Sequence, residues 1–296
     1  MPTPIKRLKQ IKRKTAINLR TLSSSMRLTP DFMIIGTQKG GTTSLYLNLI
    51  EHPSVLPAFT KEVNFFNANF SKGINWYKSF FPTTAYANYY GLKHNLSTAN
   101  ILTGEATPDY ILHPHAPKRV AEMFPKIKLI VLLRNPVDRA YSHYWHNFRY
   151  PNIEPLSFED AIEKEEERLA HEKEKMLNDE AYFSFNYNWY SYLNRGIYIN
   201  QLQNWLKWFP KEQLLILSSE EFYEKTPEVF SKVQHFLDLP EWMPSRFKKN
   251  PPDTLKQSSK LYDYPAMNNN TYQQLSDFFK PYNKQLFEYL SRKFEW

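Results

Sequence analysis

Three glycines gather where an apolar segment gives way to hydroxyl residues, in the stretch DFMIIGTQKGGTTSLYLNLIEHP from Asp31 to Pro53. They are three of the seven glycines in the chain: Gly36, Gly40 and Gly41. Three hydroxyl residues follow at once: Thr42, Thr43 and Ser44. Glycine lets backbone N–H groups approach an anion closely, and the N-terminus of a following helix adds a favourable dipole. The stretch therefore predicts a phosphate-binding loop, since a plain strand-to-helix turn would need neither the hydroxyls nor Lys39.

The position of the lysine separates this loop from the common nucleotide-binding form, G-x-x-x-x-G-K-[ST]. Gly36 and Gly41 have the spacing of its glycines, but Thr42 stands where its lysine belongs. That form also needs magnesium, which is normally held by an acid at the end of a second apolar strand.

The second apolar strand of this chain, KLIVLLRNP, ends in Arg134 rather than in an acid. A guanidinium cannot bind a metal, but it can pair with a phosphate through a bidentate fork. The residues therefore favour an anionic nucleotide held without a metal. Another candidate strand, NILTGE, does end in Glu105, so a magnesium-dependent kinase stays open as an alternative. His143 and His146 share a predicted helix, but no third ligand follows at metal-binding spacing, and we predict no metal site.

The elements that must position these residues alternate between apolar runs and helical patterns. The runs are FMIIG, NILTGE, KLIVLLR and QLLILSS, and the first three precede predicted helices over 42–51, 115–124 and 136–148. Such alternation indicates a parallel sheet covered on both faces. We therefore predict an α/β fold, with a P-loop-like parallel sheet in a single domain that carries helical insertions. The insertions are a highly charged segment, 157–180, which predicts a solvated helical face, and an aromatic one, 182–209.

Composition places the positive charge of the chain in one segment. The formal net charge is +8, but residues 1–27 contain eight basic residues and no acid, which leaves 30 basic and 30 acidic residues elsewhere. We predict a basic arm over 1–28 and one folded domain over 29–296. Because the folded body is neutral overall, any electropositive site in it must be local, and no specific nucleic-acid partner is expected.

The basic arm has four apolar residues at spacings that share one helical face: Ile5, Leu8, Leu19 and Leu22. This pattern predicts either a helix lying on a membrane surface or a disordered, solvated arm. No apolar run is long enough to span a bilayer, and no signal-peptide core precedes a cleavage site. Cysteine is absent, which excludes disulfides and thiolate chemistry and fits a reducing compartment. We expect a cytoplasmic location, with peripheral contact at the inner face of the membrane.

Three motifs in order carry a family resemblance: IIGTQKGGTTSLYLNLIEHPSV, KEVNFFNANFSKGINWYKSFFP and LIVLLRNPVDRAYSHYWH. They resemble the sulfotransferases that use 3′-phosphoadenosine 5′-phosphosulfate, in the branch that contains the heparan sulfate sulfotransferases and related bacterial enzymes. RGIYINQLQNWLKWFP is similar to the helix that follows in that branch. The resemblance runs, with gaps, from about Asp31 to the C-terminus. It implies transfer of a sulfuryl group to a hydroxyl or amine, on a saccharide or glycolipid.

The resemblance also implies roles for individual residues. The loop grips the 5′-phosphosulfate, and its early lysine reaches the oxygen between phosphorus and sulfur; the loop residues are Lys39, Gly40, Gly41, Thr42, Thr43 and Ser44. Arg134 and Ser142 match the pair that holds the 3′-phosphate, and Ser142 lies about two turns along the helix that Pro136 opens. Glu62 of KEVNFF corresponds to the general base, and Lys61 adds positive charge nearby.

The chain departs from the branch at two places. GEATPDY has Ala106 where heparan sulfate enzymes often have a lysine, so that lysine's role does not carry over. Their late KGR element, which closes over the 3′-phosphate beside a disulfide, is replaced by KQSSKLYDYP, where Lys260 is the candidate substitute. The missing disulfide and membrane anchor point away from a Golgi enzyme and towards a bacterial-type one.

Two other readings stay open at this point, the kinase and a non-enzymatic adaptor whose basic arm carries all its affinity. The acceptor is equally open, as are the choice between O- and N-sulfation and the oligomeric state. Four aromatic residues near the motifs suit either a sugar cleft or, more commonly, a core: Trp76, Tyr77, Tyr110 and His113.

Overall fold

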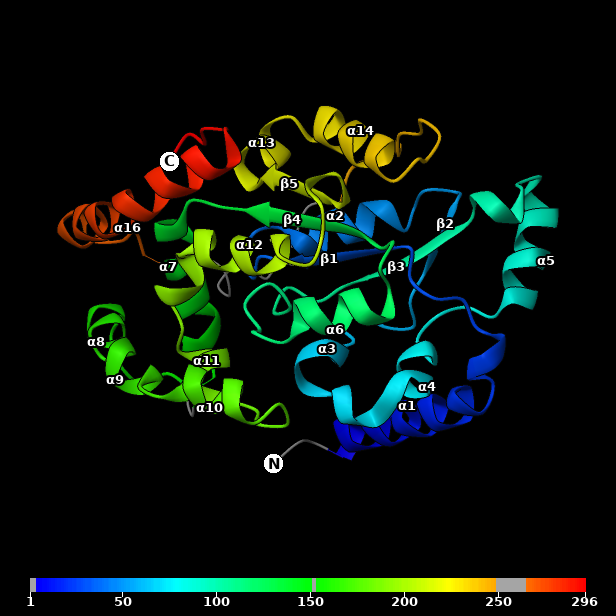
Figure 1. Ribbon diagram of the computed structural model, residues 1–296, viewed down its shortest axis with the longest axis horizontal. Helices are drawn as coiled ribbons and strands as arrows, with labels where there is room; N and C mark the ends of the chain where they lie inside the picture. Colours follow the sequence, from blue (N-terminus) through cyan, green and yellow to red (C-terminus); the bar gives the residue numbers. More distant parts are fainter. Residues whose placement is uncertain (1–3, 151–152, 249–264) are drawn as a thin grey trace.

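The computed structural model describes residues 4–150, 153–248 and 265–296, with side chains described from residue 11 onward. Its centre is a five-stranded sheet in the order β2-β3-β1-β4-β5, and every strand pair is parallel (Figure 1). The strands are β1 Phe32–Gly36, β2 Val55–Pro57, β3 Leu102–Ala106, β4 Lys128–Leu133 and β5 Leu214–Ser218. The predicted parallel α/β fold is thus confirmed.

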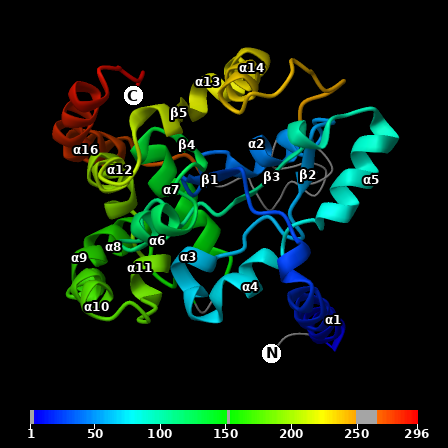
Figure 2. The same cartoon turned by 45° about the vertical axis from the view of Figure 1, so that its right-hand side comes forward.

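Helices connect the strands and cover both faces of the sheet (Figure 1 and Figure 2). They are α1 Pro4–Leu22, α2 Thr42–Leu49, α3 Phe65–Ala68, α4 Gly73–Lys78, α5 Thr84–His94, α6 Ala116–Met123, α7 Pro136–Phe148, α8 Phe158–Glu163, α9 Glu165–Leu169, α10 Glu172–Asn178, α11 Phe185–Trp189, α12 Tyr198–Leu206, α13 Ser219–Glu224, α14 Thr226–Phe236 and α16 Asn269–Leu290.

Alternate side chains of the central strands form the two halves of the core. Met33 and Ile35 of β1 pack with α3, α4, α6, α12 and α16 on one face. Phe32 and Ile34 of the same strand pack with α2, α13 and α14 on the other face. Strand side chains point alternately to opposite faces of a sheet, so a strand buried on both faces must be apolar throughout. This explains why FMIIG reads as a continuous apolar run.

Helix boundaries follow local signals in the sequence. The predicted helix over 136–148 is α7 itself, since Pro136 occupies its first turn and the Asn135 side chain accepts a hydrogen bond from the N–H of Val137 at its N-cap. The strand β2 has only three residues at the edge of the sheet, and the apolar pattern did not predict it.

The charged segment 157–180 confirms the prediction of a helical and largely solvated segment, with two exceptions. It forms three short helices, α8 to α10, and two of its carboxylates are buried. Glu165 accepts hydrogen bonds from the N–H groups of Leu193 and Asn194, both at 2.7 Å. Glu172 accepts a hydrogen bond from the hydroxyl of Tyr182 at 2.9 Å. These carboxylates pin the aromatic segment that follows to the helices, which the charge pattern alone does not reveal.

The basic arm forms the helix α1, which lies beside α4 in both views (Figure 1 and Figure 2). Ile17 is buried in the core cluster on that side. Arg20 donates hydrogen bonds to the carbonyl oxygens of Ser79 and Phe81 at 2.6 and 3.0 Å. The C-terminal end of the arm is therefore docked onto the folded body by both apolar and polar contacts.

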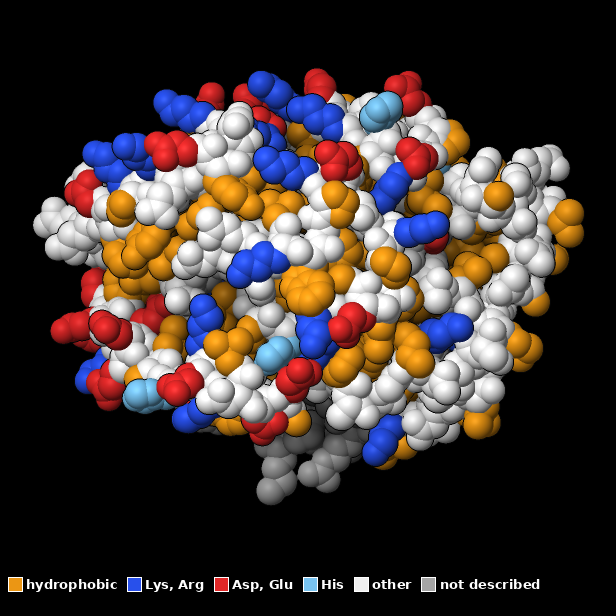
Figure 3. Space-filling model, in the orientation of Figure 1, with side chains coloured by type: hydrophobic (Ala, Val, Ile, Leu, Met, Phe, Trp, Pro, Cys, Tyr) orange, Lys and Arg blue, Asp and Glu red, His pale blue; other side chains and the backbone are white. Residues whose placement is uncertain are grey.

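No helix in the described part of the chain is long and apolar enough to cross a membrane. On the face shown in Figure 3, positive and negative side chains are interspersed.

Candidate active site

The glycine-rich loop lies at the carboxyl end of β1, in the middle of the sheet. The α-carbon of Gly40 packs so closely on β4 that a Cβ there would lie 2.6 Å from the carbonyl oxygen of Leu132. Lys39 and Gly41 have positive φ angles, 70° and 96°, which turn the chain sharply into α2. No side chain caps α2 at its N-cap residue, Gly41. The first backbone N–H groups of a helix have no intrahelical partner, so this end is suited to bind an anion.

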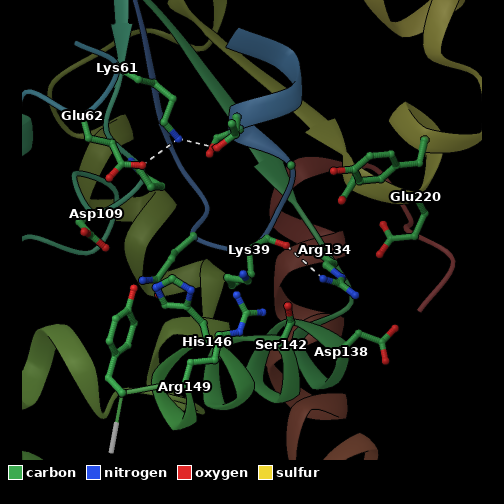
Figure 4. Close-up of a pocket in the computed structure, with 18 residues that line it drawn as sticks. Lys39, Lys61, Glu62, Asp109, Arg134, Asp138, Ser142, His146, Arg149 and Glu220 are labelled. Atoms are coloured by element: carbon green, nitrogen blue, oxygen red, sulfur yellow. Dashed lines mark hydrogen bonds and ion pairs between the residues drawn. The ribbon is translucent and has the colours of Figure 1, made fainter. Parts of the chain in front are cut away.

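A cavity of about 760 Å³ opens beside this loop. The residues lining it come from the loop and α2, the segment before α3, the turns after β3 and β4, α7 with the residues just after it, and α13: Gln38, Lys39, Gly41, Thr42, Thr43, Lys61, Glu62, Pro108, Asp109, Arg134, Asp138, Ser142, His146, Arg149, Tyr150, Ser219, Glu220 and Tyr223. Figure 4 shows Lys39 between two ends of the cavity, with Arg134 and Glu220 at one end and Lys61 and Glu62 at the other.

The first end of the cavity centres on Arg134, whose Nη1 donates a hydrogen bond to the main-chain oxygen of Lys39 at 3.2 Å. The backbone of this strand end is held from two sides. The Tyr198 hydroxyl donates to the carbonyl oxygen of Arg134 at 2.8 Å, and the N–H of Asn135 donates to Glu220 at 2.8 Å. Arg134 and Ser142 line this cavity together, which places a guanidinium and a hydroxyl where one anionic group could meet both.

The second end centres on Glu62, whose side chain is 48% exposed. Lys61 Nζ lies 2.7 Å from Glu62 Oε1 and donates a hydrogen bond to Thr43 Oγ1 at 2.5 Å. Lys61 thus ties the carboxylate to the phosphate-binding loop. A carboxylate beside a lysine, open to a cavity, is suited to accept a proton from a bound acceptor.

Cations surround Lys39 and set the electrostatic character of the cavity. Burial, and then the charges of Arg149 and Arg134, lower the pKa of Lys39 to about 8. Burial and the charges of Lys39 and Arg149 lower the pKa of His146 to about 4, so its imidazole is neutral at pH 7. The positive charge is concentrated around Lys39, where it would stabilise a bound anion, whereas the lining as a whole has four cations and four carboxylates.

Most of the predicted site residues line this one cavity. They are Lys39, Gly41, Thr42, Thr43, Glu62, Arg134 and Ser142. Gly40 and Ser44 do not line it, since both are buried under the loop, and the Ser44 hydroxyl lies 3.4 Å from that of Tyr223. Lys260 lies outside the described residues.

Sequence reasoning missed several lining residues, although one signal for them was available. Asp138, Ser142, His146 and Arg149 follow one another on α7 at steps of four, four and three residues, which puts them on one face of a helix. Ser142 was identified by resemblance, so its neighbours on that face could have been found from it. The turn after β3, which supplies Asp109, carries no comparable signal.

Other candidates from the sequence lie elsewhere. The four aromatic residues weighed for a sugar cleft do not line the cavity, and three of them are buried: Tyr77, Tyr110 and His113. Trp76 packs edge-on against Phe80 with ring centroids 4.7 Å apart. The core interpretation is therefore confirmed for this set.

The two histidines of α7 that were considered as metal ligands, His143 and His146, lie in different environments. His143 is fully buried beside Asn147, whereas His146 faces the cavity. Among the described residues, no group of three or more histidine, aspartate or glutamate side chains could hold a metal ion.

Comparison with known proteins places this fold and cavity in a family. The family model described as a sulfotransferase domain matches residues 29–291, which include the whole sheet and every residue lining the cavity. A solved bacterial structure, a sulfotransferase from Alicyclobacillus acidocaldarius, is 27% identical with a TM-score of 0.64, over 90% of this chain and 98% of that one.

Two curated relatives extend the comparison. The bifunctional heparan sulfate N-deacetylase/N-sulfotransferase 3 of Homo sapiens is 34% identical over 216 residues, which cover 71% of this chain and 22% of the relative. The membrane-associated sulfotransferase kil1 of Dictyostelium discoideum is 27% identical over 332 residues, 90% of this chain and 66% of the relative. This chain therefore spans about a fifth of the human relative's length and just under two thirds of the amoebal one's. Because the family model matches nearly the entire described fold, this chain belongs to the sulfotransferase family, an enzyme family of sulfuryl transfer.

Proposed function

We propose that the cavity binds 3′-phosphoadenosine 5′-phosphosulfate, the co-substrate that the family implies, and that the chain transfers its sulfuryl group to a hydroxyl or amine of a saccharide or glycolipid. The observation that carries the proposal is the separation of charges along one cavity. Lys39 lies on the loop, Arg134 lies to one side of it and Glu62 to the other. The donor carries a 3′-phosphate at one place and a 5′-phosphosulfate, which contains the reacting sulfur, at another. The cavity has Arg134 for the first group, Lys39 for the second and Glu62 on the far side for the acceptor, in the same order.

The residues present fit the two anionic ends of this donor. The N–H groups at the start of α2, where no N-cap side chain competes, and the ammonium of Lys39 would hold the 5′-phosphosulfate. Arg134 and Ser142 would hold the 3′-phosphate through a charged fork and a hydroxyl donor. Because Arg134 is already hydrogen-bonded to the main-chain oxygen of Lys39, little reorganisation of this guanidinium is needed when the donor binds.

The remaining residues account for the transfer itself. The acceptor oxygen or nitrogen attacks sulfur, the bond from sulfur to the bridging oxygen breaks, and the electron pair goes to the leaving phosphate. Lys39 would neutralise the charge that develops on that phosphate, and Glu62 would take the proton of the acceptor. The family resemblance of KEVNFF and the exposure of Glu62 to the cavity support this role.

A saccharide acceptor is supported by relatives whose names include heparan sulfate N-sulfotransferases. The cavity is also lined by His146, Arg149 and Tyr150, which offer an imidazole, a guanidinium and a phenol. Groups of this kind suit hydrogen bonds to sugar hydroxyls, whether the attacking group is a hydroxyl or an amine.

We also propose that the basic arm makes peripheral contact with an anionic membrane surface, on a cytoplasmic enzyme. Opposite the docked Ile17, the helix α1 exposes Ile11, Leu19 and Leu22, which are 62%, 64% and 84% exposed. Lys12 and Lys14 are exposed along the same helix. An outward apolar stripe with basic neighbours matches the interfacial helices that combine insertion with attraction to anionic lipids.

Calorimetric titration with adenosine 3′,5′-bisphosphate tests the donor site. With EDTA present, we expect tight binding to the wild type, at least tenfold weaker binding to Arg134→Ala, and unchanged binding to Lys118→Ala, which removes one exposed charge outside the cavity. A preference for ATP that appears only with magnesium would instead support the kinase.

The pH dependence of this binding tests Lys39. A bound anion raises the pKa of Lys39 above its value of about 8 in the free protein. Above pH 8, binding of the anion therefore requires that Lys39 takes up a proton. We expect constant affinity between pH 7 and 7.5, and a loss approaching tenfold per unit above pH 8. Lys39→Arg should remove this dependence, because a guanidinium stays protonated. A wild-type affinity that is constant to pH 9.5 would contradict the assignment.

Replacing the proposed base should separate catalysis from donor binding. For Glu62→Gln we expect a kcat about 10²–10⁴ lower in a transfer assay with an oligosaccharide acceptor, with the affinity for adenosine 3′,5′-bisphosphate unchanged. Glu122→Gln removes an exposed carboxylate from α6 and serves as the control. If Glu62→Gln retained the wild-type kcat, another group would have to be the base.

Flotation with lipid vesicles tests the arm. We expect the wild type to bind vesicles with anionic lipid at low salt and to be released at high salt, because part of the attraction is electrostatic. The double substitution Leu19→Ser and Leu22→Ser should abolish binding, whereas Leu92→Ser, at an exposed leucine of α5, should not. Equal binding by all three proteins would contradict the proposal.

A further inference from the structure

Glu62 lies on a segment without regular secondary structure. The residues between β2 and α3 form bends and irregular backbone, so no ladder or helix holds the proposed base in place. A general base must nevertheless lie within hydrogen-bond reach of the acceptor. A displacement of 1 Å can lower a rate about 10²-fold, so something outside this segment has to fix it.

The carboxylate of Glu105, at the end of the neighbouring strand β3, is completely buried next to this segment. Four groups donate hydrogen bonds to it. The hydroxyls of Tyr77 and Tyr110 donate to Oε1, each at 2.9 Å. The hydroxyl of Thr107 donates to Oε2 at 2.5 Å, and the N–H of Val63 donates to Oε2 at 3.4 Å.

Three consecutive backbone N–H groups after Glu62 end on this network. Val63 donates directly to the carboxylate, as above. The N–H of Asn64 donates to Thr107 Oγ1 at 3.3 Å, and the N–H of Phe65 donates to the Tyr110 hydroxyl at 2.9 Å. On the other side of Glu62, the N–H of Ala106 donates to the carbonyl oxygen of Lys61 at 3.2 Å.

The direction of these bonds depends on the carboxylate. Burial raises the pKa of Glu105 to about 7, although its hydrogen bonds oppose this shift, so the carboxylate is ionised above that pH. A hydroxyl has one proton, and an ionised carboxylate only accepts. Because Thr107 and Tyr110 donate their protons to Glu105, their oxygen lone pairs face the N–H groups of the segment. If a hydrogen-bond donor replaced the carboxylate, the hydroxyls of Thr107 and Tyr110 would rotate to accept from it. The buried N–H groups of the segment would then have weaker partners, which costs free energy of folding.

We propose that Glu105 is a positioning residue for the transfer reaction: its buried carboxylate orients Thr107 and Tyr110 so that three successive N–H groups fix the backbone beside Glu62. The inference rests on the proposed role of Glu62. Glu105 itself does not line the cavity, and each of its oxygens already accepts two hydrogen bonds, so it acts on the reaction only through this segment.

Tyr77 provides a matched control for Tyr110. Both rings are fully buried, and both hydroxyls donate to the same oxygen at the same distance. Only Tyr110 also accepts a hydrogen bond from the segment, from the N–H of Phe65. Replacing either tyrosine by phenylalanine removes the same atom from the same network, so a difference between the two variants reports the contact with the segment.

The experiment compares four variants with the wild type: Tyr110→Phe, Tyr77→Phe, Thr107→Val and Thr107→Ser. For each, the Tm, the affinity for adenosine 3′,5′-bisphosphate, and kcat and KM for an oligosaccharide acceptor are measured. We expect Tyr110→Phe and Thr107→Val to lower kcat about 10- to 100-fold, with nucleotide affinity within about twofold of the wild type. Tyr77→Phe should keep kcat within about threefold even if its Tm falls, and Thr107→Ser should restore the kcat that Thr107→Val loses.

Equal losses of kcat in the two tyrosine variants, or losses that follow Tm across all four, would show a purely structural role and overturn the inference. So would an unchanged kcat in Tyr110→Phe and Thr107→Val. Failure of the proposed function gives a different result, because it would show as a wild type without transfer or as full transfer by Glu62→Gln.

Discussion

The architecture of the cavity depends on the parallel pairing of β1 with β4, which brings Lys39 and Arg134 together so that Arg134 donates a hydrogen bond to the main-chain oxygen of Lys39. β1 and β4 pair side by side in the middle of the sheet, so the loop after one and the cation after the other must meet at the same edge. Gly40 permits this, because its α-carbon packs directly on the carbonyl of Leu132, where a side chain would not fit. The spacing between the two anion-binding groups is therefore fixed by backbone pairing rather than by flexible side chains.

Assembling this cavity brings Arg134 and Arg149 close to Lys39 before any anion is present. The lowered pKa of Lys39 records the repulsion and the burial together. Within α7, Arg139 is completely buried and donates a hydrogen bond to the carbonyl oxygen of Tyr192, while burial lowers its pKa to about 10. Such an arrangement costs stability in the empty protein and is offset when an anion binds, which is a common exchange of stability for function at active sites. Glu220, which holds the N–H of Asn135, shows that carboxylates at the rim serve to orient the cationic strand end.

The end of the cavity around Glu62, proposed for the acceptor, is organised by a different strand. β3 lies on the other side of β1, and its last residue but one is Glu105, whose carboxylate accepts hydrogen bonds from α4, from the turn after β3 and from the segment that carries Glu62. The end of the cavity around Arg134, where we propose that the donor binds, is thus positioned by β1 with β4. The end around Glu62, where we propose that the acceptor binds, is positioned by β1 with β3. In-line sulfuryl transfer needs both ends aligned, and their common neighbour β1 provides the rigid reference for the two.

The sequence by itself determined the features that depend on local spacing. The alternation of apolar runs and helical patterns predicted the parallel sheet, Pro136 marked the start of α7, and the glycines with Lys39 predicted a phosphate-binding loop. Motif resemblance then identified Glu62, Arg134 and Ser142, which the structure gathers in one cavity. Only the tertiary structure decided which distant residues meet and which charges are buried. The enclosure of Glu105 by Tyr77 and Tyr110, the buried carboxylates of segment 157–180 and the short edge strand β2 could not be read from the chain. The physical reason is that burial and hydrogen-bond partners arise from contacts between segments far apart in sequence, whereas periodicity and turn signals record only neighbours along the chain.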